Sequence, residues 1–442
     1  MPTATENIEL TISQTLGYLF EKHRKHKNGD IAAHAEQAFK RFLQTGLPDR
    51  RSEEYKYFPV HRHFPELPVI QPEAGDPGAN FVFAPIIDDQ QAIQLVFIDG
   101  QYSKKYSSEN LQEKGVEIKS LNQLSSEELA IILEDHLDTY NVNRDPFIEL
   151  NSSFLRDGIF IRVSKTTEAR PVYCYYLTTS EETNSYRNFR NVMILEADSR
   201  AELAEFFFSE DNAAGFENYF TEIYAGRGAK MNLYRVQHKR GEETLVNNIN
   251  IYQKENSLVN SFTFSLSGKM LRNNLNFLLE EENCESHLYG FYFADGDDTI
   301  DNHTTVDHQK PHCFSNENYK GILDKNGKAV FNGKIFVRQD AQKTNAFQSN
   351  KNIVLTDTAT INTKPQLEIW ADDVKCSHGA TTGQIDNEQL FYLRSRGLDE
   401  RTAKALLLHA FAIEIVDKIE LDPIKNYLTK VINKLLGYHF ED

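Results

Sequence analysis

The stretch Ser261-Phe262-Thr263-Phe264-Ser265-Leu266 is followed closely by Asn274-Leu275-Asn276-Phe277. In both stretches apolar and polar residues alternate, which places one set of side chains on each face of an extended strand. Similar short runs lie on both sides of this stretch, at residues 159–163, 172–177, 191–195, 231–236, 244–252, 287–293, 329–337 and 353–355. The sequence therefore predicts a mostly β protein with a strand-rich core over residues 147–375.

The spacing of these runs favours strands that coil on one another. Phe264, Phe277 and Phe291 recur at 13 and 14 residues, and the second half of the core lacks the long helical patterns of βαβ units. Frequent asparagines, as at Asn273-Asn274, are expected at tight corners because Asn tolerates left-handed backbone. A stack of short strands, as in a β-helix, is favoured, with a β-sandwich as the competing architecture. One helix is expected to interrupt the core at residues 201–208, with residues 215–219 after it.

Residues 1–60 predict an N-terminal helical domain. Ile8, Ile12, Leu16 and Phe20 recur near helical spacing, and residues 31–42 continue this pattern. Residues 61–146 predict a proline-rich linker and a small mixed α/β element, with a strand at 92–98 and a short helix at 126–136.

Residues 376–442 predict a C-terminal helical domain. One helix is expected at residues 387–396, ending at Gly397, and a second at 399–419. Asp422 is expected to cap a third helix with Pro423 at its first position. This helix carries one apolar stripe, which includes Ile424, Leu428 and Ile432.

Composition excludes several classes of function. The 442 residues carry 48 Lys and Arg against 65 Asp and Glu, a net charge of −17, so neither nucleic acid nor an anionic membrane surface is an expected partner. No run approaches the roughly 18 apolar residues of a spanning helix, and the start lacks the features of a signal peptide. The four cysteines form no CxxC pair. A cytoplasmic protein without a disulfide framework is expected.

No local motif of a common enzyme class is present, including the P-loop, GxGxxG, GxSxG and HExxH. A cluster of potential metal ligands is formed by His303, His308, His312 and Cys313, because imidazole and thiolate bind transition metals. Their spacing is not that of a compact zinc motif, so hydrogen-bonded histidines at a polar corner are the alternative. Of the other cysteines, Cys174 is expected in the core, and Cys284 at a solvated edge after three glutamates.

A second candidate metal site is formed by Cys376 and His378, between the β-rich core and the C-terminal helices. In an extended segment, residues i and i+2 point to the same side, with Cα atoms roughly 6.5 Å apart. A thiolate beside an imidazole suits iron or an iron–sulfur cluster. A buried cysteine and a surface histidine without metal chemistry are the alternative.

Several segments resemble the SufB/SufD family of iron–sulfur cluster assembly scaffolds. The most specific block spans residues 376–381, 384–386 and 388–398 (CSHGAT, QID and EQLFYLRSRGL). Supporting likeness lies in residues 51–57 (RSEEYKY, with Tyr55 where the family usually has Trp), 301–310 (DNHTTVDHQK), Ser315, 319–321 and 329–335. The chain is more similar to the SufD branch, because the SufB branch carries Glu-His-Glu-Ala where residues 377–380 read SHGA. SufB also carries a cysteine in the segment that corresponds to residues 348–350, where this chain has none.

The resemblance implies a right-handed parallel β-helix flanked by helical terminal domains, and a scaffold without turnover of its own. It implies a heterodimer with SufB through the β-helix and docking of the SufC ATPase on the C-terminal helices. Cys376 and His378 would assist transient cluster assembly at the SufB seam. Arg394, Arg396 and Gly397 are candidate partner contacts, although Arg394 and Arg396 would also suit a solvated helix end. No tightly bound cofactor is implied, while reduced flavin in the complex and a homodimer of the isolated chain are left open.

Two other hypotheses come from the residues alone. Carbohydrate-active enzymes on a β-helix need two carboxylates, and Asp297-Asp298 and Asp372-Asp373 are adjacent pairs. Consecutive residues on a strand point to opposite faces, which makes these pairs poor acid/base couples. The other alternative is a β-rich interaction protein without metal chemistry.

Overall fold

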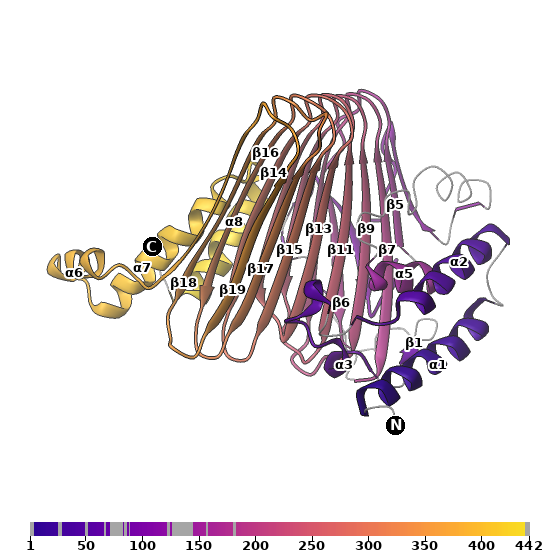
Figure 1. The fold of residues 1–442 in the computed structure, drawn as a ribbon, viewed down its shortest axis with the longest axis horizontal. Coiled ribbons are helices and arrows are strands. Elements are labelled where there is room, and N and C mark those ends of the chain that lie inside the picture. Colours follow the sequence, from indigo (N-terminus) through magenta and orange to yellow (C-terminus); the bar gives the residue numbers. More distant parts are fainter. Residues whose placement is uncertain are drawn as a thin grey trace.

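The computed structural model describes residues 4–24, 29–48, 52–65, 68–70, 83, 86–87, 89–121, 124–125, 145–155, 158–179 and 183–437. These residues form a β-solenoid of about eight turns with helices from both ends of the sequence packed around it (Figure 1). The predicted mostly β fold, a parallel β-helix between N-terminal and C-terminal helices, is confirmed. The β-sandwich alternative is wrong, because almost all strand pairs are parallel.

The solenoid consists of two ten-stranded sheets. The first sheet contains, in spatial order, β4 (Val116–Ser120), β5 (Gly158–Val163), β7 (Ser185–Leu195), β9 (Phe216–Ala225), β11 (Thr244–Gln253), β13 (Met270–Leu279), β15 (Thr299–His308), β17 (Lys328–Val337) and β19 (Thr360–Ile369), with β1 (Val69–Ile70) beside β7. The second sheet contains β3 (Gln101–Tyr102), β2 (Ile93–Ile98), β6 (Val172–Thr178), β8 (Arg200–Ser209), β10 (Lys230–His238), β12 (Leu258–Ser267), β14 (Glu285–Ala294), β16 (Phe314–Leu323), β18 (Asn345–Val354) and β20 (Lys375–Gly383).

From β5 onward, consecutive strands alternate between the two sheets, so one turn of the coil takes two strands. The register places Thr244 beside Met270, Met270 beside Thr299 and Thr299 beside Lys328, which gives turns of 26, 29 and 29 residues. The 13- and 14-residue spacing of the three phenylalanines is therefore half a turn. Phe264 and Phe291 are direct neighbours on the outer face of the second sheet, whereas Phe277 lies in the first sheet and points inward.

The space between the sheets holds the main hydrophobic core. Two reciprocal pairs between β14 and β16 show how tightly it is filled. Gly290 lies beside Tyr319, and Tyr292 lies beside Gly321. A Cβ atom on Gly290 would lie 2.2 Å from the Tyr319 ring, and one on Gly321 would lie 2.1 Å from the Tyr292 ring. Each glycine therefore makes room for the tyrosine on the neighbouring strand.

The N-terminal helices cover the outer face of the first sheet. They are α1 (Ala4–Arg24), α2 (Gly29–Thr45), the 3-10 helix η1 (Glu53–Tyr55), α3 (Val60–His63) and α5 (Pro146–Ser153). The predicted apolar positions Ile12, Leu16 and Phe20 are buried with Phe216 of β9 and Met270 of β13. The helices predicted within residues 1–60 are confirmed by α1 and α2. Their apolar stripes pack in a cluster that includes residues of the first sheet.

The C-terminal helices α7 (Glu400–Val416) and α8 (Asp422–Leu435) cover the outer face of the second sheet, and α6 (Asn387–Ser395) extends away from it (Figure 1). The predicted stripe on α8 is buried there. The expected cap is wrong by one position, because Leu421 is the N-cap and Asp422 belongs to the first turn. Within the described part of the chain, no helix has the length and apolar character that crossing a membrane requires.

The helix expected at residues 201–208 is wrong, because this segment lies in β8, and the following residues 216–219 lie in β9. Ala201, Leu203 and Phe207 point into the solenoid, and Ala204 and Phe206 point to the helix-covered outer face. Burial on both faces removes the alternation that identifies a strand, and a short apolar run then resembles a helix.

The asparagines expected at corners lie mostly within strands. Asn274 Nδ2 donates to Asn248 Oδ1 at 2.7 Å, and Asn273 Nδ2 donates to Asn302 Oδ1 at 3.0 Å, so they form ladders between stacked turns. The left-handed corner positions hold residues of several types: Asp198, Asn256, Asn283, His312, Lys325 and Lys343. The corners therefore accept several types of residue with exposed side chains. The ladders favour asparagine, because its side chain has both a donor and an acceptor.

Part of the segment predicted as a linker and small mixed α/β element lies within the described residues. The strand expected at 92–98 is confirmed as β2, whereas the helix expected at 126–136 lies outside the described residues. The predicted boundary at 375/376 coincides with the start of β20, which is the last strand of the solenoid. The helices of the C-terminal region begin at Asn387.

Candidate functional site

The solenoid ends at two unpaired strand edges. In the described chain, β19 pairs only with β17 and β20 pairs only with β18. The residues of both strands are exposed or half-buried, and Ile369 and Trp370 leave 40% and 49% of their surface open. A long, exposed, partly apolar edge is a template for pairing with another chain.

The direction of the free backbone groups follows from the ladder. Lys375 donates its backbone N–H to Thr344 O at 2.9 Å. In a parallel ladder, alternate residues bond to the same neighbour. The N–H groups of Cys376, His378 and Ala380 therefore point to the open side of β20.

Cys376 and His378 lie on the inward face of this last strand. Cys376 is half-buried, packs against the interior core and is the register partner of Ala346. His378 is exposed and is the register partner of Gln348. The two-residue spacing places both side chains on one face, as expected from an extended segment. Burial raises the pKa of the Cys376 thiol, so a cation must displace its proton to bind the sulfur.

A buried polar pair lies one turn behind His378. Gln348 Nε2 donates to Glu317 Oε2 at 2.6 Å, while Gln348 Oε1 is buried without a hydrogen-bond partner. Burial raises the pKa of Glu317 to about 7. Sequence reasoning missed this pair, because only the register shows that Glu317, Gln348 and His378 form one column.

The three predicted partner residues lie at the end of α6. Arg396 Nη2 donates to Tyr392 OH at 3.0 Å, Arg394 pairs with Glu400 at 3.4 Å, and Gly397 takes a left-handed φ of 96° that ends the helix. Helix α6 buries none of its side chains, and Phe391 leaves 75% of its surface exposed. This helix therefore presents an uncovered aromatic surface beside cations.

Of the predicted cluster of His303, His308, His312 and Cys313, the structure brings only His308 and Cys313 near each other. His303 lies on the outer face of β15, His308 is buried at the end of that strand, and His312 is exposed in a corner. No group of three or more His, Cys, Asp or Glu side chains in the described ranges could hold a metal ion. Cys174 lies in the core as expected, whereas the solvated edge expected for Cys284 is wrong. Its thiol donates to Lys254 O of the preceding turn at 3.3 Å and to Glu281 O at 3.2 Å.

Two motifs that the sequence left separate meet on the outer face of the first sheet. Glu54 contacts His303 Nδ1 at 3.2 Å and also pairs with Lys334. His303 Nε2 in turn lies 2.8 Å from Asp301 Oδ1. Arg272 Nη1 donates to Asp301 Oδ2 at 2.6 Å and to Glu54 O at 2.9 Å. The segment around Glu54 is thereby tied to strands β13, β15 and β17.

Aromatic packing completes this contact. The Arg272 guanidinium lies 3.9 Å from the centre of the Tyr55 ring, and the Tyr55 hydroxyl donates to Asp145. Glu53 pairs with Lys364 on β19. The tyrosine that departs from the family pattern is therefore a buried ring with a satisfied hydroxyl.

We expect the Glu54 contact to weaken in acid. Burial alone would raise the pKa of Glu54 above its ordinary value of 4.5. Hydrogen bonds from His303 and Lys334 outweigh this effect and lower the pKa to about 2. A depressed pKa gives a contribution that is complete above about pH 4.5 and is lost as the pH falls toward 2. Urea unfolding of wild type and Glu54→Gln should differ most near pH 6 and converge toward pH 3. A difference that does not change with pH would contradict this assignment.

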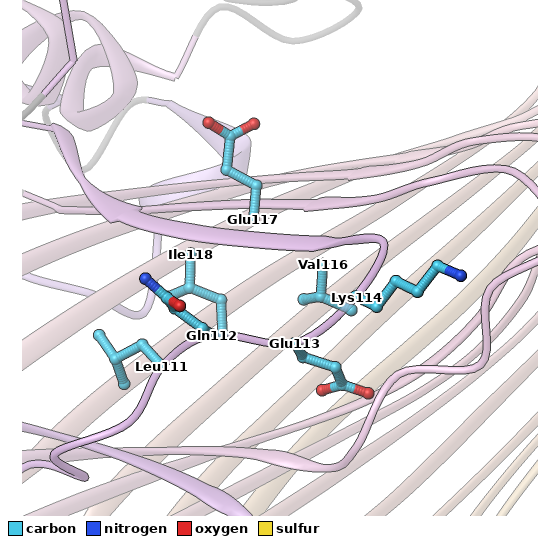
Figure 2. Close-up of a pocket in the computed structure, with 7 residues that line it drawn as sticks. All are labelled: Leu111, Gln112, Glu113, Lys114, Val116, Glu117 and Ile118. Carbon is cyan, nitrogen blue, oxygen red and sulfur yellow. The ribbon is translucent and has the colours of Figure 1, made fainter.

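A surface recess of about 500 Å³ is lined by residues 111–114 and 116–118, at the opposite end of the first sheet from β19 (Figure 2). Figure 2 shows the carboxylates of Glu113 and Glu117 pointing in opposite directions. Glu113 pairs with Arg170 and Glu117 with Lys119. The recess therefore does not gather the two carboxylates that glycoside hydrolysis requires.

Two models of known protein families match the sequence of this chain. A family model described as the SufBD core domain of SUF-system FeS cluster assembly matches residues 176–411. The chain belongs to the SufBD family. A second model, the SufBD protein N-terminal region, matches residues 11–172, so the relationship also covers the segment where sequence motifs gave little likeness. Membership places the chain in the SUF system of iron–sulfur cluster assembly and supersedes the hypotheses of a carbohydrate-active enzyme and of an unrelated interaction protein.

Individual relatives agree with this assignment. The chain is 30% identical over 423 residues to the iron–sulfur cluster assembly protein SufD of Escherichia coli, which covers 95% of each chain. It is 31% identical over 402 residues to a SufBD family protein of Synechocystis, covering 88% of this chain and 87% of the relative. A chloroplastic protein of Arabidopsis thaliana, ABCI7, is 26% identical over 406 residues.

Proposed function

We propose that this chain is a non-enzymatic scaffold subunit that assembles iron–sulfur clusters together with a SufB-type chain and a SufC-type ATPase. The observation that carries the proposal is the open end of the solenoid, where β20 combines an unpaired edge with Cys376 and His378 on its inward face. A SufB-type solenoid would add its own strands to this edge and satisfy the free backbone groups. The cytoplasm is the proposed location.

The cluster is cargo in this proposal. Cys376 would supply a sulfur and His378 a ring nitrogen to iron as the cluster forms, and the SufB-type partner would supply the remaining ligands. A soft thiolate and an imidazole fit iron in this role. We propose no tightly bound cofactor in the chain itself; a reduced flavin would act at the level of the complex.

Helix α6 is the proposed docking surface for the SufC-type ATPase. Phe391 and Tyr392 are exposed aromatic residues on it, and Arg394 and Arg396 follow them. Interfaces are enriched in aromatic residues and arginine. ATP hydrolysis would then take place on the partner and move α6 and α7, which lie directly after β20 in the chain.

The ligand role predicts a loss of cluster without loss of assembly. His378→Ala and Cys376→Ala should each reduce anaerobically bound iron and sulfide by about tenfold or more, because a metal site weakened even in its outer shell loses 10- to 100-fold in affinity. The matched control is Ser377→Ala, which lies between them on the opposite face of β20. If the iron and sulfide counts are unchanged, the two residues are not ligands, while the scaffold role remains.

The pairing role predicts a loss of assembly from a single backbone group. Ala380→Pro removes an N–H on the open side of β20 and leaves the hydrogen bonds to β18 in place. One lost hydrogen bond and the bulk of the ring should weaken co-purification with the SufB-type chain by about tenfold or more. Ala380→Val is the control, because it keeps the N–H. Equal recovery of the partner with both variants would contradict pairing through this edge, and SufC-type recovery reports separately on α6.

A further inference from the structure

Cys284 and Cys313 occupy equivalent positions in adjacent turns of the solenoid. They immediately precede β14 and β16, whose first residues are register partners, and Phe314 N donates to Cys284 O at 2.9 Å. Neighbouring parallel strands lie about 4.8 Å apart, which falls within the Cα separation that a disulfide bridges. The backbone therefore holds the two cysteines in a geometry that can be cross-linked.

The two thiols converge on one point. Cys284 Sγ donates to Glu281 O at 3.2 Å, and Cys313 Sγ donates to the same oxygen at 3.3 Å. The two thiols interact with each other, and this contact raises the pKa of Cys284 and lowers the pKa of Cys313. Both side chains are buried from water in this structure, so an oxidant reaches them only when the surrounding chain opens.

A buried base lies beside Cys313. His308 Nε2 contacts Ser315 Oγ at 2.9 Å, and His308 Nδ1 is buried without a hydrogen-bond partner. When Nε2–H donates to Ser315, Nδ1 carries the free lone pair. Ser315 lies two residues after Cys313, so the His308 contact with Ser315 places the imidazole on the side of the chain that Cys313 faces. After the larger effect of Cys284, His308 also lowers the pKa of the Cys313 thiol. An orphaned ring nitrogen beside a thiol can accept its proton.

We propose that Cys313 and Cys284 are a redox-active dithiol that a peroxide oxidises to an intrachain disulfide, with His308 as the base. The Cys313 proton passes to His308 Nδ1, and the thiolate attacks one peroxide oxygen, breaking the O–O bond. The leaving hydroxide takes the proton back and departs as water. The Cys284 thiol then attacks the resulting sulfenic sulfur, which forms the S–S bond and releases a second water. Two thiols are oxidised and one peroxide is reduced.

The disulfide between Cys284 and Cys313 would cross-link adjacent turns of the solenoid. It would close a loop from Cys284 to Cys313 that contains all of β14 and β15. Such a cross-link lowers the conformational entropy of the unfolded chain and therefore increases the free energy of unfolding. This proposal concerns a site separate from β20 and stands without the proposed ligand role of Cys376.

The direct test uses the wild-type chain. The reduced protein is treated with hydrogen peroxide, quenched in acid, denatured, alkylated and mapped by mass spectrometry. We expect two of the four cysteines to escape alkylation, with the Cys284 and Cys313 peptides joined and lighter by two hydrogen atoms. The urea midpoint of the oxidised protein should rise and return after reduction. Free, singly oxidised or over-oxidised Cys284 and Cys313 without a cross-link would overturn the proposal.

The role of His308 is tested by rate. His308→Gln keeps a donor for Ser315 and removes the base, so disulfide formation in the native protein should slow by about tenfold or more at neutral pH. In denaturant, wild type and variant should oxidise at the same rate. Cys376→Ser is the control for the half-exposed thiol and should leave the cross-link yield unchanged. If wild type and His308→Gln form the disulfide at equal rates in the native protein, His308 does not act as the base.

Discussion

Replacing Arg272 by methionine is expected to lower the free energy of unfolding by about 3–5 kcal/mol, as for other buried charges left without a partner. Arg272 is almost fully buried, pairs with buried Asp301 and stacks on Tyr55. Methionine fills much of the volume and removes the charge. The Asp301 carboxylate would then keep only its contact with His303. Urea unfolding followed by circular dichroism measures the change.

The control for this prediction is Lys343→Met, which breaks an exposed pair with Asp373. Exposed pairs contribute only about 0–1 kcal/mol, so this variant should remain close to wild type. Asp301→Asn added to Arg272→Met should recover part of the lost stability, because it removes the orphaned charge. Equal, small effects of the Arg272 and Lys343 variants would show that the segment around Glu54 is not held by this pair.

Gly290→Ala is the second substitution with a large expected effect. Its new methyl group would lie 2.2 Å from two ring atoms of Tyr319, in a part of the interior that is closed on all sides. The ring has no free space to enter, because Tyr292 and Gly321 form the matching pair beside it. Overpacking of this kind destabilises by about 1–3 kcal/mol. The measured quantity is the urea midpoint of the full chain.

Gly17→Ala is the matched control. Gly17 lies within α1, and a Cβ atom there would meet no other atom within 4 Å. Alanine is favoured over glycine inside a helix by about 0.5–1 kcal/mol, so this variant should be as stable as wild type or more so. If both variants leave the midpoint unchanged, the Gly290 and Tyr319 pair does not fill the core as described.

The contacts that Glu53, Glu54 and Tyr55 make with the first sheet give the N-terminal motif a structural role. Glu53, Glu54 and Tyr55 together contact residues of β13, β15, β17 and β19. Three of these strands lie directly behind the open end of the solenoid, and β19 is its edge. The N-terminal segment therefore supports the sheet whose last strand, β19, borders the open end of the solenoid.

The sequence by itself determined the elements that carry a clear local pattern, and their order along the chain. Alternation in residues 261–266, the apolar stripe through Ile424 and Leu428, and Gly397 at a helix end each express a local rule, and the structure agrees with each. The block around Cys376 pointed to the family, because it is a continuous motif. These signals depend on neighbours within a few residues, which is the range over which a sequence can be interpreted directly.

Only the tertiary structure decided which distant residues meet. Residues 201–208 form a strand because both faces of this segment are covered, and Cys284 is buried because the preceding turn of the coil lies against it. Glu54 and His303 are 249 residues apart and still share a contact. Register between turns of 26 and 29 residues sets these neighbours. A shift of one residue would reverse every side chain in a strand, and no local pattern encodes that choice.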